Sequence, residues 1–131
     1  MVNLPEFYII PEDVFRLGNA TSPRLSHVRP SDAQTTTVNG VTVVIADGRH
    51  GVSVFDRAAI ARVALSGWVW RIAGRTPLPA GLKLVHLPLP DTPGHYVIAP
   101  MQNMPLSKYR GLLEELALHA TRVGKHEVKR A

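Results

Sequence analysis

The chain has 131 residues, enough for one domain and too few for two, so we expect a single domain over residues 1–131. It contains no cysteine, which excludes disulfides, thiolate nucleophiles and cysteine-based zinc sites. Neither a secretory signal sequence nor an apolar run of about 18 residues occurs. We therefore expect a soluble protein without membrane segments, whose export would use a route other than the Sec pathway.

The net charge of +5 comes mainly from arginine, with 11 arginines against four lysines. Because the guanidinium group is a planar fork that fits phosphates and carboxylates, this excess favours an anionic ligand or an acidic partner. Ordinary surface charge is the alternative interpretation. Residues 57–90 contain no acidic residue and five basic ones, which are Arg57, Arg62, Arg71, Arg75 and Lys83.

The first half of the chain predicts short strands and one long loop. Residues 13–18 alternate in polarity and predict a strand that carries Arg16. Residues 19–32 contain two prolines and predict a loop. The pair Asn39-Gly40 accepts a left-handed backbone and joins two β-branched runs, 35–38 and 41–46, which predicts a hairpin.

The second half predicts four strands, over residues 52–55, 68–72, 82–87 and 95–99, and two helices. Asp56 is a typical helix N-cap, and the first helix is predicted from Arg57 to about Ser66. A longer helix is predicted from Leu106 to Val123, followed by a frayed basic tail over 124–131. Its apolar face consists of Tyr109, Leu112, Leu113, Leu116, Ala117 and Ala120. This order of elements indicates an α+β fold.

Several common kinds of site are absent from the sequence. The six histidines form no HExxH pattern and have no close carboxylate partners, so we expect no metal site. There is also no GxSxG motif and no glycine-rich phosphate loop.

The segment from Arg49 to Arg57 combines groups that could bind a small molecule. Ser53 and Phe55 are two residues apart on a strand and therefore share one face. The hydroxyl could form a hydrogen bond to a ribose or an amide, while the aromatic ring packs against a flat ring. The alternative is that both side chains simply belong to the core.

Four sequence blocks occur in an order that resembles a known family. They are Gly51-Val-Ser-Val-Phe-Asp-Arg-Ala58, Leu78-Pro-Ala-Gly-Leu-Lys-Leu84, His95-Tyr-Val-Ile-Ala-Pro100 and the helix start Pro105-Leu-Ser-Lys-Tyr109. Together they resemble the small cytotoxic effectors that are delivered by type VI secretion, whose fold is similar to that of NAD-dependent ADP-ribosyltransferase toxins. The resemblance covers roughly residues 49–123.

The resemblance implies a split, curved β-sheet with one internal helix and a long C-terminal helix, and with NAD bound between the sheet halves. It implies that Arg16, Ser53 and Phe55 contact the cofactor. The catalytic residues would be Ser53 with His95 or Tyr96, which occupy the place where the wider superfamily has a glutamate. No acidic residue stands at that place in this chain. NAD is then the donor, and no metal is needed.

The resemblance also implies a biological setting. Such toxins act in the bacterial cytoplasm, in either the producing or the recipient cell, and a small acidic immunity or antitoxin protein holds them inactive. The acceptor of the ADP-ribose is left open by the sequence. An acidic inhibitor would fit the positive charge of residues 57–90.

Two further hypotheses belong to other functional classes. The first is a metal-independent RNase toxin in which His50 and His95 act as acid and base on one phosphate. The second is a non-catalytic module that binds nucleic acid or protein, for which the 6% aromatic content is a weak fit.

Overall fold

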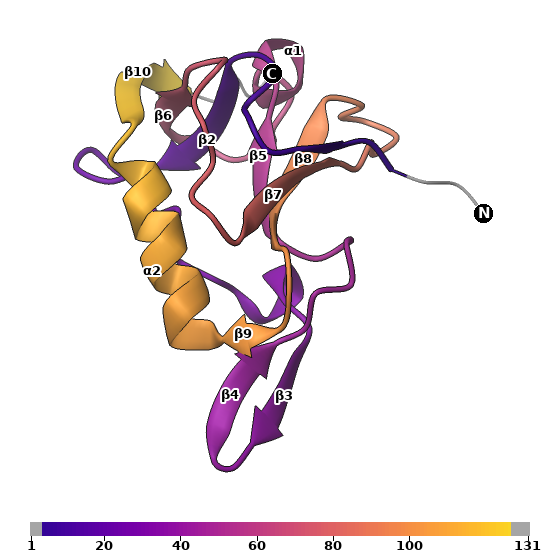
Figure 1. The fold of residues 1–131 in the computed structure, drawn as a ribbon. Coiled ribbons are helices and arrows are strands. Elements are labelled where there is room, and N and C mark those ends of the chain that lie inside the picture. Colours follow the sequence, from indigo (N-terminus) through magenta and orange to yellow (C-terminus); the bar gives the residue numbers. More distant parts are fainter. Residues whose placement is uncertain (1–3, 127–131) are drawn as a thin grey trace.

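Two β-sheets and three helices make up residues 4–126, the part of the chain that the computed structural model describes (Figure 1). From edge to edge, the larger sheet contains β1 (Glu6–Phe7), β7 (Leu82–His86), β8 (His95–Pro100), β5 (Val52–Phe55), β2 (Val14–Gly18), β6 (Gly67–Ile72) and β10 (Ala120–His126). The smaller sheet contains β3 (Thr35–Val38), β4 (Val41–Val44) and β9 (Met104–Pro105). The helices are η1 (Pro30–Asp32), α1 (Arg57–Ile60) and α2 (Leu106–Ala117). No helix in residues 4–126 is long and apolar enough to cross a membrane.

The larger sheet is weakly joined at its centre. Strands β2 and β5 are paired only through Phe15 and Phe55, whereas β2 pairs with β6, and β5 with β8, along most of their lengths. Beyond that single pair, β2 and β5 separate. The sheet therefore consists of two halves, β10-β6-β2 and β5-β8-β7-β1, which diverge from one point of contact.

Helix α2 covers one face of this sheet and forms the main core with it. Tyr109, Leu113 and Leu116 recur at helical spacing, and each is fully buried. They pack with alternate residues of the central strands, Val52, Val54, Leu84 and Ile98. The Tyr109 hydroxyl donates to the Ile98 carbonyl and accepts the backbone N–H of Val52, which ties the helix to β5 and β8.

The other face of the same strands carries the intervening residues. Because side chains alternate along a strand, Ser53 and Phe55 of β5 lie on this second face with His95 and Val97 of β8. The second face has only a small apolar cluster of its own, Val85, Val97 and Ala99. The polar residues discussed below therefore lie outside the main core.

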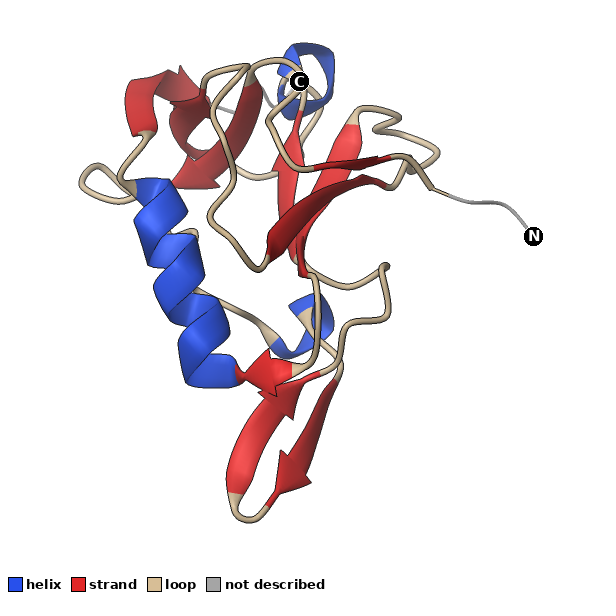
Figure 2. Cartoon of the chain, viewed as in Figure 1, coloured by secondary structure: helices blue, strands red, loops and turns tan. Residues whose placement is uncertain are grey.

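Most of the predicted strands are confirmed, and the mixed α+β class with them (Figure 2). The hairpin has its turn at Asn39 and Gly40, both with positive φ, as the sequence indicated. The short strands β1 and β9 were not predicted, because two residues give no usable periodicity.

Both helix predictions were too long. The first helix ends at Ile60 instead of Ser66, and α2 ends at Ala117 instead of Val123. Residues Ala120–His126 form β10 along β6, with a bulge between Arg122 and Gly124. This segment contains β-branched residues and a glycine, which are poor helix formers, and pairing supplies hydrogen-bond partners for β6. The C-terminal helix therefore begins at Leu106 as predicted, but its predicted extension to Val123 is wrong. Of the predicted frayed tail, residues 124–126 belong to β10, and residues 127–131 lie outside the described range.

Candidate functional site

Ser53 and His95 form a hydrogen-bonded pair on the second face of the sheet. The Ser53 Oγ and His95 Nε2 atoms are 2.9 Å apart, and the His95 Nδ1 atom is 2.8 Å from the Leu87 carbonyl oxygen. Because a carbonyl only accepts, Nδ1 must carry the ring proton when the ring is neutral, and Nε2 is then the acceptor. The Ser53 hydroxyl therefore donates to His95, and the Leu87 carbonyl fixes the tautomer.

The surroundings of His95 favour its neutral form. The residue is only 6% exposed, and burial lowers its pKa below the usual 6.5, with the nearby His86 adding to this effect and the Leu87 hydrogen bond opposing it. Near pH 7 the ring is thus neutral, and Nε2 can take a proton from the hydroxyl it contacts. A serine, a neutral histidine and a carbonyl that orients the ring form an arrangement suited to proton transfer.

Aromatic rings flank this pair on the side where the two sheet halves meet. The Phe55 ring lies 5.2 Å from the His95 ring, tilted by 53°. Phe15 is the β2 partner of Phe55. The Arg57 guanidinium lies 5.0 Å from the centre of the Phe15 ring and forms an ion pair with Asp13 at 3.8 Å. The sequence interpretation did not assign Arg57 or Asp13 to the site, and neither has a local signal that would have indicated it.

Gly94 allows strand β8 to begin beside this group. A Cβ atom at Gly94 would lie 2.0 Å from a carboxylate oxygen of Asp56, so only glycine fits here. Asp56 is the N-cap of α1, as predicted, and its side chain accepts the Ala59 backbone N–H at 2.8 Å. The Asp56 backbone N–H also donates to the Gly94 carbonyl at 2.9 Å. This close approach holds the start of α1 against the residue that precedes His95.

Arg16 contacts the same strand from the side, through backbone atoms. Its guanidinium and Nε groups donate to the carbonyls of Ser53 at 2.8 Å, Arg24 at 3.1 Å and Pro23 at 3.2 Å. Burial lowers the pKa of Arg16 to about 10, so the group is still charged near neutral pH. Arg16 therefore joins the loop after β2 to Ser53, and its contact is with the Ser53 carbonyl, not the hydroxyl.

Tyr96 is not brought to this group. It follows His95 in the strand and points to the opposite face, where its ring stacks 4.7 Å from His86 and its hydroxyl lies 3.5 Å from a carboxylate oxygen of Glu12. Of the two residues expected to replace the superfamily glutamate, only His95 contacts Ser53. No carboxylate is hydrogen-bonded to Ser53 or His95 among residues 4–126.

His50 lies at the far end of β5 from His95. It bonds through Nδ1 to the Asp47 carboxylate at 2.5 Å, whereas His95 pairs with Phe55. Five backbone steps of about 3.3 Å each lead from His50 to Phe55, so the backbones of His50 and His95 are on the order of 15 Å apart. They cannot flank one phosphate, so this geometry does not support the RNase hypothesis.

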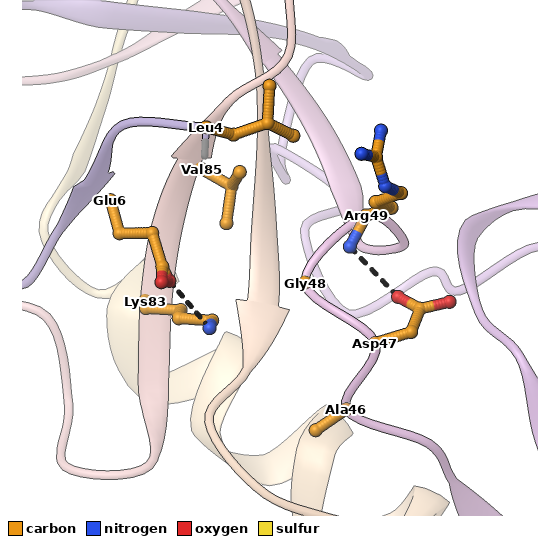
Figure 3. Close-up of a pocket in the computed structure, with 8 residues that line it drawn as sticks. All are labelled: Leu4, Glu6, Ala46, Asp47, Gly48, Arg49, Lys83 and Val85. Atoms are coloured by element: carbon orange, nitrogen blue, oxygen red, sulfur yellow. Dashed lines mark hydrogen bonds and ion pairs between the residues drawn. The ribbon is translucent and has the colours of Figure 1, made fainter. Parts of the chain in front are cut away.

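A cavity of about 570 Å³ opens on the same face of the sheet, two strands away from Ser53 (Figure 3). The strand register places Ser53, Val97, Val85 and Glu6 in one row across the sheet. The strand wall of the cavity includes Glu6 and Lys83, whose charged groups are 2.7 Å apart, and the opposite wall is the loop over residues 46–49.

Residues 4–126 contain no cluster of three or more histidine, aspartate or glutamate side chains that could hold a metal ion. The candidate site consists of Ser53, His95 and Phe55, with Arg16 behind the strand and the open cavity two strands away.

Comparison with known proteins bears on this geometry. A model of the Tse2 ADP-ribosyltransferase toxin family matches residues 11–124, which is most of the chain. The match includes β2, β5 and β8, the three strands that carry the candidate site. No curated protein matches the sequence.

Proposed function

The chain belongs to the Tse2 ADP-ribosyltransferase toxin family, and from this premise we propose that it cleaves NAD at the nicotinamide–ribose bond and transfers ADP-ribose to an acceptor. The observation that carries the proposal is the Ser53–His95 pair, with its tautomer fixed by the Leu87 carbonyl. This pair supplies a positioned hydroxyl and a proton acceptor on the face of the sheet that α2 does not cover.

The electrostatics of the pair suit this reaction. As nicotinamide leaves with the bonding electrons, positive charge develops on the ribose. A protonated imidazole would oppose that charge, whereas a neutral ring whose Nε2 is an acceptor does not. The Ser53 hydroxyl can bond a ribose hydroxyl, and the proton that the attacking acceptor atom loses can pass to His95 Nε2. Phe55 provides a flat apolar surface beside the pair.

The rest of the dinucleotide would occupy the 570 Å³ cavity, which is separated from Ser53 by the buried side chains of Val97 and Val85. That volume is within the usual range of small-molecule pockets. Lys83 and Arg49 line the cavity together with Glu6 and Asp47, and Lys83 pairs with Glu6 at 2.7 Å, so Arg49 is the cation left for the diphosphate. Arg16, which the family resemblance assigns to the cofactor, would act here mainly by holding the Ser53 carbonyl.

The test is nicotinamide release from NAD by the purified protein, with and without cell lysate. We expect lysate-dependent release that is lost in Ser53→Ala. Ser107→Ala is the matched control, because Ser107 is an exposed serine on α2, away from the site. Absence of release by the unmodified protein under both conditions would refute the proposal, as would full release by Ser53→Ala.

The proposal includes an acidic immunity protein and action in the bacterial cytoplasm, both of which rest on the family resemblance. The net charge of +5 suits an acidic inhibitor. The basic run over residues 57–90 is not a uniform patch, since Arg57 pairs with Asp13 and Lys83 pairs with Glu6. Inhibition by such a protein should weaken as salt rises, and an association rate independent of salt would argue against this part of the proposal.

A further inference from the structure

A second open region of the surface is lined by cations and lies apart from the 570 Å³ cavity. It consists of two adjoining cavities of about 280 and 410 Å³, both lined by Arg24 and His27. The first is completed by Arg16, Leu17, Arg29, Val63 and Leu65, and the second by Ser22, Ser26 and Arg110. We refer to the two together as the basic groove. No carboxylate-bearing residue lines either cavity.

Most of the positive charge in the basic groove is uncompensated. The side chains of Arg24, His27 and Arg110 form no hydrogen bond or ion pair within residues 4–126. Arg29 pairs with Asp32 at 3.3 Å, which is the one carboxylate in contact with a groove cation. Unpaired arginines that converge on a concave surface favour an anionic ligand.

The groove lies on the α2 face of the sheet. The loop that follows β2 passes beside α2, where it meets Arg110 (Figure 1). Arg16 lines the groove and donates to the Ser53 carbonyl at 2.8 Å. Arg16 alternates with Phe15 along β2, and Phe15 pairs with Phe55, so the Arg16 side chain lies on the face opposite the Ser53 hydroxyl and His95. The groove and the Ser53–His95 pair are therefore on opposite faces of the sheet.

We propose that the basic groove binds the phosphate backbone of a single-stranded nucleic acid. Arginine and serine side chains together are typical contacts to phosphate oxygens. The two cavities form a trough with cations along its length, which suits a chain of phosphates better than a single diphosphate. Val63 and Leu65, the latter 66% exposed, offer an apolar wall for a base or ribose.

The structure offers a matched pair of variants to test the binding. Arg110 and Lys108 are both exposed and lie on opposite sides of buried Tyr109 on α2, and only Arg110 lines the groove. Arg110→Glu and Lys108→Glu change the net charge equally, so a difference between them reports the position of the charge. Arg24→Gln is a second groove variant that removes charge without reversing it.

The measurement is the fluorescence anisotropy of a labelled 20-nucleotide single strand, as RNA and as DNA, without NAD and at several salt concentrations. We expect Arg110→Glu to weaken binding about tenfold more than Lys108→Glu and to reduce the salt slope by about 0.7 for the lost phosphate contact. Arg24→Gln should weaken binding several-fold. The RNA and DNA arms identify which strand is preferred. Equal loss in the two glutamate variants would overturn the groove assignment.

One further arm separates a nucleic acid from an acidic protein. Polyglutamate that binds while both oligonucleotides do not would point to an acidic protein and overturn the nucleic-acid proposal. The binding assay contains no NAD, so its outcome is independent of nicotinamide release, and failure of either proposal leaves the other standing.

Discussion

Substitution of His95 by glutamine separates its structural role from its role as a proton acceptor. A glutamine amide offers an N–H to the Leu87 carbonyl and an oxygen to the Ser53 hydroxyl, so both hydrogen bonds of the imidazole can be retained. The amide cannot take up a proton near neutral pH. Alanine would leave the Leu87 carbonyl without its partner and open a cavity, because His95 is buried.

The expected loss of stability is small, whereas the expected loss of activity is large. Loss of the tilted ring contact with Phe55 should cost about 0.5–1.5 kcal/mol in the free energy of unfolding. For a chain of this length that corresponds to a fall in melting temperature of roughly 2–8 °C. Loss of a general base should lower the rate of nicotinamide release by about 10²–10⁴-fold.

The assay is nicotinamide release at saturating NAD, with a melting curve for each variant. His95→Gln should keep a cooperative melting transition near that of the unmodified protein while release falls by at least about a hundredfold. Release within about threefold of the unmodified protein would refute the idea that His95 accepts the proton. A double substitution with Ser53→Ala should then add little further loss, because the two groups act as one unit.

Three other outcomes can be checked in the same assays. Nicotinamide release should be constant above pH 6.5 and fall as the pH drops through the lowered pKa of His95, and a release rate that rises on acidification would contradict this. Because the folded pKa lies below the unfolded value of 6.5, the stability that the neutral ring contributes is complete above pH 6.5 and is lost as the pH falls from there through the folded pKa. Leu113→Ala should cost about 2–5 kcal/mol in the free energy of unfolding, seen by denaturant titration, yet leave release by the folded fraction unchanged. Arg16→Ala should weaken NAD binding in calorimetry and lower the free energy of unfolding by about 1–3 kcal/mol, because the Ser53 carbonyl loses its donor. Arg16→Lys should restore only part of the NAD affinity and of the stability, because one ammonium group cannot reach all three carbonyls.

Local patterns were sufficient for strands β2 to β8 and for the starts of α1 and α2. The β-branched runs on either side of Asn39-Gly40 specify the hairpin, and Asp56 is the N-cap that the sequence indicated, accepting the Ala59 N–H. Strand β10 could not be predicted in this way. Ala120 continues the apolar spacing of α2, and the pairing that overrides it, from Ala120 to Ile72, joins residues far apart in the sequence.

The candidate site could also be predicted only in part from local sequence patterns. Ser53 and His95 were selected from separate sequence blocks, but the register of β5 against β8 determines that His95, and not Tyr96, faces Ser53. The predicted strand already placed His95 and Tyr96 on opposite faces of the sheet, but it did not show which of them shares a face with Ser53. The Leu87 carbonyl could not have been found from sequence, because every residue has a carbonyl and only the fold selects this one.

The weak junction of the large sheet explains why Arg16 is needed where it is. Past the Phe15–Phe55 pair, β2 no longer supplies N–H donors to β5, so the Ser53 carbonyl would lack a strand partner. The Nη1 group of Arg16 takes that place, and its other donors hold the carbonyls of Pro23 and Arg24. One buried cation thus allows the two sheet halves to diverge without leaving a carbonyl unsatisfied. The same contact links the loop of the basic groove to the strand of the Ser53–His95 pair. A ligand that displaces Arg24 would therefore shift the Arg16 guanidinium and, through it, the backbone of Ser53.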